Sequence, residues 1–504
     1  MLATPITVAA ADAVDAALTL AQTADDRGAD LVEWRVDGMA LDAAGQTAVA
    51  DLVRNTPVPC ILTCRTASQG GAFDGPEADR IALLQSLAGA QTAPRLLDLE
   101  FDAWSADASL RSAASALRTQ GTSLILSSHD FTGRPADLLR RIADMGEADC
   151  DVIKVAWFTN SVREALECAD VLANRPKPMI ALAMGEAGLI SRVLSGAWGG
   201  LLTFAALDAD TATAPGQPTL EDMLLRYRFR AINPQTRVYG LVGWPLGDSP
   251  GLARHNEMFV EHGWDAVYLP LPVREGWERF KADMLSCIDH PCLRFGGVSV
   301  TMPHKANCLR LVQDAGGSVG DAAAVAVASN TLIVGPEGTM RAANTDVVGV
   351  VEPLRALGAD MVAASAAVLG AGGAARAACV GLLQAGASVR IFNRTPDRAR
   401  AVAEDLASVG DIAVGGGGPF NIVVQCTSVG MAHGDQPEGD AAAASGFDVG
   451  MVDAPAFALE SVYDPLETAF VKAMRAVGAK VAVGTDMWAT QAAAQQTLWA
   501  AGGW

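Results

Sequence analysis

The stretch Asp151-Val152-Ile153-Lys154-Val155-Ala156 is a short apolar run interrupted by a single lysine. Its length and its β-branched residues predict a buried strand. Seven more runs of this kind, separated by helical stretches, occupy the first part of the chain. Eight strands interleaved with helices over about 200 residues predict an α/β fold of the (β/α)8 TIM-barrel type, with a doubly wound open sheet as the alternative. The other predicted strands are Ile6–Ala10, Leu31–Arg35, Cys60–Arg65, Leu96–Glu100, Ser123–His129, Met179–Met184 and Leu201–Phe204.

The composition of the 504 residues narrows the class of protein. A formal net charge of -20 argues against a general nucleic-acid binder, which needs clustered Lys and Arg. The nine cysteines form no CxxC pair and have no histidine at metal-ligand spacing, so we expect reduced thiols and no metal. Asp12 and Asp15 precede the first basic residue, Arg27, which is the reverse of a signal peptide. Because no apolar run is long enough for a membrane span, we expect a cytoplasmic protein without a membrane partner.

Two further α/β units follow the predicted barrel. The stretch Ala214–Pro218 and then Asn233-Pro234 contain the Pro and Gly residues that are typical of a domain boundary. A new strand, Val238–Val242, starts the second unit, and the run Ala366–Leu369 starts the third.

Charged side chains gather at the C-terminal ends of the barrel strands, where barrel enzymes build active sites. Lys154 is the most informative, because burial lowers the pKa of a lysine and a neutral amine can form a Schiff base with a ketone. A paired structural lysine is the alternative. The other charged residues at these ends are Glu33, Arg35, Arg65, Asp98, Glu100 and His129.

His129 is a candidate general base, because the pKa of histidine lies near neutrality. A histidine held in the core is the alternative. Arg35, Arg65 and Arg192 are candidates to clamp an anionic substrate, since a guanidinium group binds a carboxylate through two hydrogen bonds.

Six segments of the first part are specific in combination: Glu33-Trp34-Arg35-Val36-Asp37, Thr63-Cys64-Arg65, Ser128-His129-Asp130, Val152-Ile153-Lys154-Val155-Ala156, Met184-Gly185 with Ser191-Arg192, and Ala214-Pro215-Gly216-Gln217. In this order they resemble type I 3-dehydroquinate dehydratase. The resemblance implies that Lys154 forms an imine with the substrate ketone. His129 would remove the neighbouring proton and return it to the departing hydroxyl. The implied substrate-binding residues are Glu33, Arg35, Arg65, Arg192, Thr213 and Gln217.

The chain departs from that family at two positions. The family often has a glutamate after the third-strand arginine, where it would partner the histidine, but this chain has Gln69 before Gly70-Gly71. We therefore expect His129 to handle protons differently. Thr213 stands where a serine is usual, and this keeps the hydroxyl.

A glycine-rich segment, Gly370-Ala371-Gly372-Gly373-Ala374-Ala375, follows the strand Ala366–Leu369 and opens a helical run. This is the G-x-G-x-x-A form of the dinucleotide fingerprint, in which a tight turn and a helix N-terminus receive a pyrophosphate. The next strand, Val389–Phe392, ends in Asn393-Arg394-Thr395. Because an arginine at this place favours the 2′-phosphate of NADP, we expect NADP rather than NAD. A surface arginine is the alternative.

A lysine and an aspartate follow strand-like runs upstream of this fingerprint. Lys305 ends the segment Val298–Lys305 after a proline turn, and Asp346 ends Asn344-Thr345-Asp346. Together they could handle the proton that accompanies hydride transfer to a ketone. Ordinary polar loop residues are the alternative.

Over roughly residues 236–504 the chain resembles shikimate dehydrogenase. The segments that carry this resemblance are Gly243-Trp244-Pro245, Ser249-Pro250 with His255-Asn256, Thr301 to Lys305, Asn330-Thr331, Asn344-Thr345-Asp346, the glycine fingerprint, Asn393-Arg394-Thr395, Thr427-Ser428-Val429-Gly430-Met431, Tyr463-Asp464-Pro465 with Thr468, and Gly484 to Gln491.

The resemblance implies a catalytic pair, Lys305 and Asp346, in a cleft between two lobes. We accordingly predict a barrel over 1–225, a substrate-binding lobe over 236–345, a Rossmann lobe over 346–480, and final helices over 481–504 that return to the substrate lobe. The implied substrate ligands are Ser249, Thr301, Asn330, Asp346, Tyr463 and Gln491. The implied NADP(H) ligands are Gly370, Gly372, Gly373, Ala374, Asn393, Arg394, Thr395, Thr427 and Gly484.

One segment departs from this second family. The family usually holds the substrate carboxylate with two serines, whereas Leu246–Pro250 is about two residues shorter and keeps only Ser249, next to Asp248. A related acid such as quinate is therefore an alternative substrate.

The two implied activities are consecutive. Dehydration of 3-dehydroquinate gives 3-dehydroshikimate, which the second half would reduce with NADPH to shikimate. A quinate or shikimate oxidiser and a metabolite-sensing regulator are the alternatives. A regulator is expected to lose catalytic residues, but Lys154, His129, Lys305 and Asp346 are all present.

Overall fold

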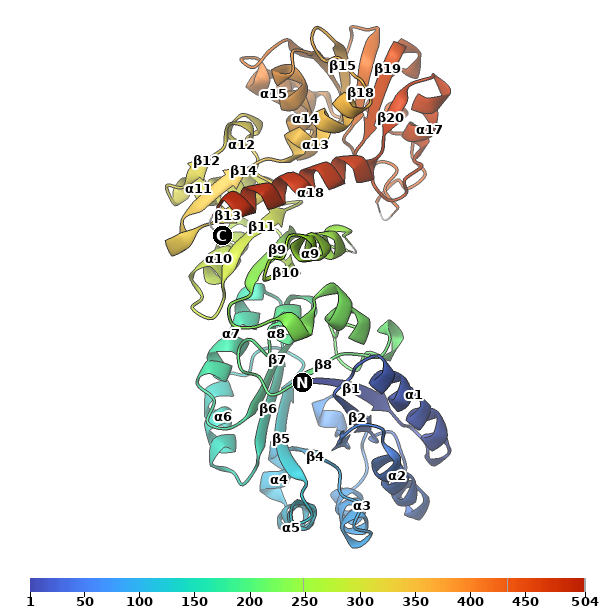
Figure 1. Cartoon of the computed structure of the whole chain (residues 1–504), viewed down its shortest axis with the longest axis vertical. Coiled ribbons are helices and arrows are strands. Elements are labelled where there is room, and N and C mark those ends of the chain that lie inside the picture. Colours follow the sequence, from blue (N-terminus) through green and yellow to red (C-terminus); the bar gives the residue numbers. More distant parts are fainter. Residues whose placement is uncertain (248, 433, 503–504) are drawn as a thin grey trace. The chain divides into compact units, whose positions relative to one another are not determined.

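The computed structural model of the protein describes residues 1–247, 249–432 and 434–502 (Figure 1). It contains two compact units. The first unit comprises Met1–Leu241, Pro245–Arg274 and Ala282–Phe295. The second comprises Val242–Trp244, Glu275–Lys281 and Gly296–Trp504. The predicted boundaries at 225, 345 and 480 stay predictions.

Eight parallel strands form the core of the first unit, in the order β7-β6-β5-β4-β3-β2-β1-β8. The backbone N–H of Leu201 donates to the carbonyl of Met179 at 2.9 Å, which joins the two ends of this order. The sheet is therefore a nearly closed barrel, which confirms the (β/α)8 prediction. The strands are β1 (Leu2–Thr7), β2 (Leu31–Arg35), β3 (Cys60–Thr63), β4 (Leu96–Glu100), β5 (Ser123–Asp130), β6 (Val152–Phe158), β7 (Met179–Met184) and β8 (Thr203–Phe204).

The first predicted strand, Ile6–Ala10, was placed too late in the chain. In the structure Leu2 and Ala3 pair with β8, and both are fully buried. Ala9 and Ala10 are exposed. Pairing between strands, rather than local apolar character, therefore sets the bounds of β1.

The barrel interior is divided into an apolar layer and a charged layer. Ile61, Ile125 and Val152 belong to the buried apolar cluster that fills the N-terminal part of the barrel. Because side chains alternate between the two faces of a strand, the residue two positions later points the same way. For Val152 that residue is Lys154, so the charged layer lies directly above the apolar one.

Helices follow the strands of the barrel. Side chains cap several of them: Asp42 accepts hydrogen bonds from two backbone N–H groups at the start of α2, and Asp107 does so at the start of α5. The helices are α1 (Val14–Asp26), α2 (Ala43–Asn55), α3 (Glu77–Gly89), α4 (Phe101–Ala106), α5 (Ala108–Arg118), α6 (Leu138–Glu147), α7 (Val162–Ala173) and α8 (Leu189–Val193).

A second, mixed sheet has the order β10-β9-β11-β13-β14-β12. Strand β13 runs antiparallel to both β11 and β14. The strands of this second sheet are β9 (Arg237–Gly243), β10 (Ala266–Pro272), β11 (Phe295–Val300), β12 (Ser318–Val319), β13 (Thr331–Val334) and β14 (Met340–Ala343). The accompanying helices are α9 (Gly251–Glu261), α10 (Trp277–Asp289), α11 (Lys305–Asp314) and α12 (Asp321–Ala326).

The third sheet is parallel, in the order β17-β16-β15-β18-β19-β20. Its order turns back between β15 and β18, which is where doubly wound sheets bind ligands. The strands are β15 (Ser365–Leu369), β16 (Ser388–Phe392), β17 (Ile412–Val414), β18 (Phe420–Gln425), β19 (Val452–Glu460) and β20 (Lys480–Ala482). The helices are α13 (Asp346–Ala356), α14 (Gly373–Gln384), α15 (Pro396–Leu406), α16 (Ala441–Ser445), α17 (Ala469–Ala476) and α18 (Gly484–Ala501).

The long helix α18 returns from the third sheet toward the second, alongside α13 (Figure 1). Its Gln495 accepts a hydrogen bond from the Ser299 hydroxyl at 2.8 Å and donates to the Thr331 hydroxyl at 3.0 Å. These contacts join the last helix to β11 and β13. Among the helices within the described ranges, none is long and apolar enough to cross a membrane.

Candidate active sites

The C-terminal mouth of the barrel holds a cavity of about 60 Å³. The structure brings every residue predicted for the first site to this cavity. Gln69, Phe131 and Phe204 line it as well. The predicted residues are Glu33, Arg35, Arg65, His129, Lys154, Arg192, Thr213 and Gln217.

Lys154 is buried and paired. Its ammonium donates to Asp98 Oδ2 at 2.8 Å and lies 3.7 Å from Glu33 Oε1. It also lies 4.5 Å from the centre of the Phe204 ring. The two carboxylates and the aromatic ring hold the amine at one place in the cavity wall.

Asp98 is the residue to which sequence reasoning gave no role. Its Oδ1 accepts hydrogen bonds from Ser127 at 2.6 Å and from Arg65 at 2.8 Å. Burial raises the pKa of Asp98, but Arg65 and Lys154 outweigh this effect and hold the pKa well below its usual range. Asp98 is therefore a fixed negative charge that orients two predicted site residues. Its place at the end of a barrel strand was the available signal.

His129 lies at the end of β5 against Gln69. Gln69 Oε1 accepts a hydrogen bond from the backbone N–H of His129 at 3.0 Å and lies 3.2 Å from its ring Nδ1. Burial, together with the charges of Arg65 and Lys154, holds the pKa of His129 well below its usual value. The imidazole is therefore neutral near pH 7 and can accept a proton.

The three arginines differ in their partners. Arg35 pairs with Asp37 at 2.8 Å, and Arg65 pairs with Asp98. Arg192 is buried, and its Nε has no hydrogen-bond partner within the part of the chain that the structure describes. Burial lowers the pKa of Arg192 to about 10. An anionic ligand would stabilise the charge of a buried guanidinium group that lacks a hydrogen-bond acceptor.

Thr213 and Gln217 belong to one loop at the edge of the cavity. Gln217 Oε1 accepts hydrogen bonds from the Thr213 backbone at 2.8 Å and from its hydroxyl at 3.2 Å. Gly216 has φ +69°, and a Cβ there would lie 2.2 Å from the carbonyl of Gly185. Only glycine fits this turn, which sets the two polar side chains beside the cavity.

The second predicted site is centred on an ion pair between Lys305, the first residue of α11, and Asp346, the first residue of α13. Asn330 Nδ2 donates to Asp346 Oδ1 at 2.8 Å and to the Thr345 hydroxyl at 3.0 Å. Asn344 Oδ1 accepts from the Asp346 backbone at 3.0 Å. The structure thus brings Lys305, Asp346 and Asn330 into direct contact.

The other residues predicted to bind the second substrate are spread over several loops. The Thr301 backbone N–H donates to Val242 at 2.8 Å. Burial raises the pKa of the half-buried Tyr463. The amide oxygen of Gln491 is buried and, within the described ranges, meets no hydrogen-bond donor. Gln491 is therefore suited to accept a hydrogen bond from a ligand hydroxyl.

Ser249 belongs to the first compact unit. Its hydroxyl accepts a hydrogen bond from the Gly251 backbone at 3.3 Å, just before α9. The acidic neighbour, Asp248, lies outside the described residues.

The glycine-rich loop after β15 has the space that a dinucleotide requires. Gly370 has φ +115°, and a Cβ there would lie 3.1 Å from the carbonyl of Cys426. A Cβ on Gly372 would meet open space, and one on Gly373 would lie 3.5 Å from Lys305 Cδ. Gly373 and Ala374 begin α14, whose N-terminus has no side-chain cap among the described residues. Its free N–H groups fit a pyrophosphate, directly beside the Lys305 side chain.

A cavity of about 140 Å³ lies at the ends of β16 and β18, on either side of β15. Asn393, Arg394 and Thr427 line it, as predicted for the nucleotide. Thr395 precedes the first residue of α15. Gly484 packs differently, because a Cβ there would lie 2.1 Å from the carbonyl of Val462.

Arg398, in α15 four residues after the cavity-lining Arg394, is a second cation that sequence reasoning missed. Arg394 and Arg398 are exposed and have no ion-pair partner among the residues described, whereas Arg400 pairs with Asp397. The spacing of four residues across the start of α15 was the available signal. Two unpaired guanidinium groups fit a phosphate on the ribose.

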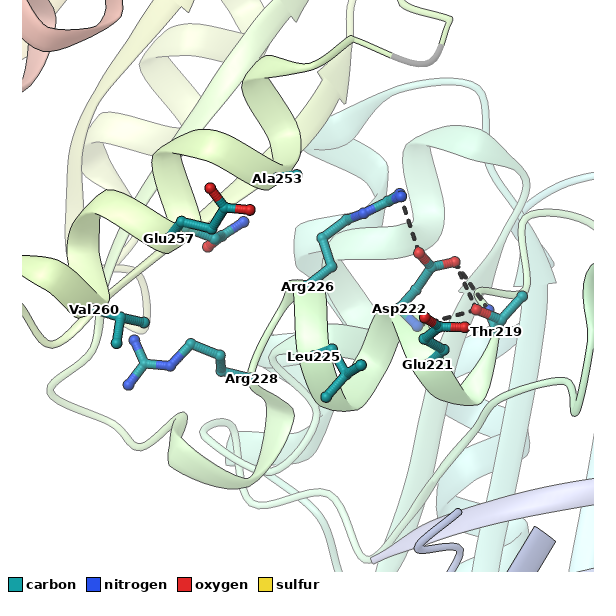
Figure 2. A pocket seen from close by; sticks show the side chains of 10 residues that line it. Thr219, Glu221, Asp222, Leu225, Arg226, Arg228, Ala253, Glu257 and Val260 are labelled. Atoms are coloured by element: carbon teal, nitrogen blue, oxygen red, sulfur yellow. Dashed lines mark hydrogen bonds and ion pairs between the residues drawn. The ribbon is translucent and has the colours of Figure 1, made fainter. Parts of the chain in front are cut away.

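A larger cavity, of about 430 Å³, lies elsewhere in the first unit (Figure 2). It is bordered by α9 and by the segment that follows the barrel, and Asp222 and Arg226 pair across one side at 3.1 Å. Leu225 and Val260 are exposed on its walls. Its ten lining residues are all different from those of the two predicted sites.

Comparison with known proteins assigns the two halves separately. The family model described as type I 3-dehydroquinase matches residues 3–234, and the model described as the shikimate dehydrogenase substrate binding domain matches residues 241–332. A 3-dehydroquinate dehydratase of Desulfotalea psychrophila is 36% identical over 201 residues, which are 39% of this chain and 85% of that protein.

A protein similar to both halves is the chloroplastic bifunctional 3-dehydroquinate dehydratase/shikimate dehydrogenase of Arabidopsis thaliana. It is 31% identical over 308 residues, which are 60% of this chain, and the match spans about half, 48%, of its own length. Among solved structures, shikimate 5-dehydrogenase of Thermus thermophilus in complex with NADP(H) and shikimate is 28% identical, with a TM-score of 0.45. That likeness covers 53% of this chain and 94% of the other.

Proposed function

Residues 3–234 of the chain belong to the type I 3-dehydroquinase family, and we propose that this half dehydrates 3-dehydroquinate to 3-dehydroshikimate. One observation carries the proposal. The cavity holds a fixed lysine, a neutral histidine and a buried arginine whose Nε meets no acceptor among the described residues, and these groups suit a substrate that has both a ketone and a carboxylate.

In the proposed reaction Lys154 attacks the substrate ketone, and loss of water gives an imine. The positive charge on the imine nitrogen makes the neighbouring C–H acidic, and His129 removes that proton. The electrons then form the C=C bond as the hydroxyl departs, and His129 returns the proton so that water leaves. Water hydrolyses the imine and releases the enzyme. Arg192 holds the carboxylate throughout.

Borohydride trapping tests the imine. With 3-dehydroquinate present, borohydride reduction is expected to add the mass of the bound ligand to the wild-type chain at Lys154. Lys154→Ala is the test variant, and Lys177→Ala is the control because Lys177 does not line the cavity and donates to the carbonyls of Ala148 and Cys150 and to the Cys150 sulfur. Equal trapping on Lys154→Ala and on the wild type would show that this lysine forms no imine.

For the second half we propose reduction of 3-dehydroshikimate to shikimate with NADPH. The bound nicotinamide would supply the hydride. Lys305 and Asp346 would manage the proton that joins the carbonyl oxygen, and Asn330 would hold Asp346 in place through its 2.8 Å hydrogen bond. The glycine loop, with Gly373 beside Lys305, would set the cofactor next to this pair.

The unpaired Arg394 and Arg398 support NADP over NAD. A direct assay of 3-dehydroshikimate reduction with each cofactor tests this choice. We expect a lower KM for NADPH, and a lower KM for NADH would overturn the cofactor assignment.

Quinate is the second candidate substrate for this half, because only Ser249 remains in the shortened segment before α9. The discriminating measurement is oxidation of shikimate and of quinate by the same protein with NADP. A higher kcat/KM for quinate would replace the shikimate assignment.

A further inference from the structure

We propose that Gln69 is a positioning residue, which holds His129 as the tautomer protonated on Nδ1 and so makes Nε2 the proton-accepting atom. This inference deepens the proposed dehydratase activity and rests on it for its catalytic meaning. Its structural content, the tautomer of one histidine, stands on contacts within the barrel alone.

The orientation of the Gln69 amide follows from the backbone of His129. The backbone N–H of His129 lies 3.0 Å from Gln69 Oε1, and a backbone N–H can only donate. If the amide were turned around, its NH2 group would face this N–H and two donors would meet. The oxygen of the Gln69 amide is therefore the atom that faces His129.

The orientation of the amide then determines the tautomer of the ring. Nδ1 of His129 lies 3.2 Å from the same Gln69 Oε1. An amide oxygen has no hydrogen to give, so the hydrogen in this contact belongs to Nδ1. A neutral imidazole carries one N–H, which leaves a lone pair on Nε2.

The loop that carries Gln69 has little freedom to move. Gln69 is buried, and its backbone N–H donates to the Thr66 carbonyl at 3.0 Å. The next residue, Gly70, has φ +78°, and a Cβ there would lie 2.3 Å from the Phe131 ring. The ring of Phe131 thus packs against Gly70, the residue that follows Gln69.

The Gln69 amide adds no charge beside His129, whereas a carboxylate at position 69 would favour a protonated ring. The charges that act on His129 come from four strands of the barrel, and the cations among them outnumber the anion. These conditions keep the ring neutral, as a base requires. The charged groups that face His129 are Arg35, Arg65, Lys154 and Asp98, and the same cavity is lined by Glu33 and Arg192.

Two variants separate the charge of Gln69 from its hydrogen bond. Gln69→Glu keeps the size and both acceptor contacts but adds a negative charge. Gln69→Leu keeps a similar volume but removes the acceptor. Thermal melting of both variants confirms that each is folded before the comparison.

Nitrogen NMR of the full chain, labelled at histidine, reads the tautomer directly. The protein has six histidines, and the His129 signals are those that vanish in His129→Asn. In the wild type at pH 7 we expect a protonated Nδ1 and an unprotonated Nε2. Gln69→Glu is expected to move the titration of His129 to higher pH, and Gln69→Leu is expected to give a mixture of tautomers.

The kinetics of dehydration give the second readout. Gln69→Leu is expected to lower kcat by about 10- to 100-fold at every pH, because a poorly oriented base loses most of its contribution, while KM changes little. Gln69→Glu is expected to move the acid limb of the kcat profile to higher pH. It is also expected to raise KM, because the added negative charge repels an anionic substrate.

Each outcome has a defined meaning. A wild-type His129 protonated on Nε2, or a Gln69→Leu variant with the wild-type tautomer and the wild-type kcat, would overturn the inference. If the wild type neither dehydrates 3-dehydroquinate nor traps with borohydride, the proposed function fails, and the NMR result still decides the role of Gln69.

Discussion

The lysines of the two sites, Lys154 in the barrel and Lys305 in the second unit, have different surroundings. In the barrel, Lys154 lies inside a strand and is paired with carboxylates from two other strands of the same sheet, Asp98 of β4 and Glu33 of β2. In the second unit, Lys305 starts a helix after a loop and has one carboxylate partner, Asp346. The barrel cavity therefore carries its main charges before any ligand arrives. The second site has an ion pair beside an open glycine loop, and the cofactor and substrate proposed above would complete its geometry.

The largest effect is expected from a substitution that inactivates the barrel site and leaves the second site intact. Lys154→Ala should lower the dehydration rate by about 10⁴- to 10⁶-fold, because it removes the group that bonds to the substrate. Reduction of 3-dehydroshikimate should continue at the wild-type rate. Separate assays of the two steps check this, and an equal loss of both activities would mean that the variant had disturbed the whole chain.

The matching change in the second unit is Lys305→Ala. It should lower kcat for reduction by about 10²- to 10⁴-fold, since a lysine that handles a proton contributes on this scale. Dehydration should be unaffected. The check is the rate of NADPH loss with 3-dehydroshikimate, with Lys281→Ala as the control because Lys281 lies on α10 against the Trp277 ring. A variant that keeps full reductase activity would remove Lys305 from the catalytic pair.

Arg192→Met is expected to weaken substrate binding in the barrel and to raise its stability. The loss of a charged hydrogen-bond donor should raise KM for 3-dehydroquinate by about 10- to 100-fold. The pKa of Arg192 is lowered to about 10 in the folded state, so below that pH its charge opposes folding. The variant should therefore melt at a higher temperature than the wild type, by about 2–4 °C for each kcal/mol regained.

Calorimetry and steady-state kinetics on one preparation test this pair of effects. Arg192→Lys is the control, because it keeps a cation in the cavity. A lower melting temperature for Arg192→Met together with an unchanged KM would contradict both halves of the prediction.

Arg394→Gln tests the cofactor end of the second site. Removal of one free guanidinium group should raise KM for NADPH by about tenfold, with little effect on KM for NADH. Arg400, which is paired with Asp397 and does not line the cavity, provides the control through Arg400→Gln. Equal changes in KM for both cofactors would show that Arg394 does not recognise the 2′-phosphate.

The last prediction concerns stability alone, at Glu460 at the end of β19. Burial raises the pKa of Glu460 to about 7, against hydrogen bonds from Thr468 and the Val462 backbone. Because the folded state holds this proton more tightly than the unfolded state, stability should fall as the pH rises from about 4.5 to 7. Glu460→Gln removes this dependence, and its advantage over the wild type should grow over that range to the order of 1–3 kcal/mol.

Denaturant titrations at several pH values measure this difference. Glu404→Gln is the control, because Glu404 is an exposed residue of α15. A stability difference that stays constant with pH would show that Glu460 ionises normally.

The sequence predicted the barrel well because short apolar strands are local features. It also predicted which strand ends carry charge, since the C-terminal ends of parallel strands meet at one face. The strand-end position of Asp98 did not by itself predict its role, because its partners Arg65, Ser127 and Lys154 come from other parts of the barrel and depend on the register of the sheet. The start of β1 was missed for the same reason.

In the second unit, the glycine loop and the Lys305–Asp346 pair were predictable from motifs that follow strands. Arg398 was missed because a spacing of four residues from Arg394 is a weak signal in an exposed helix. We assign it to phosphate binding because it follows Arg394 by four residues and has no acidic partner among the described residues.

A coupled assay with 3-dehydroquinate and NADPH tests the two-activity account most directly. The purified wild-type chain should oxidise NADPH from 3-dehydroquinate, and Lys154→Ala should do so only when 3-dehydroshikimate is supplied. A wild-type chain that oxidises neither NADPH nor NADH with either substrate would contradict the account. Consumption of NADPH from 3-dehydroquinate by Lys154→Ala at the wild-type rate would contradict it as well.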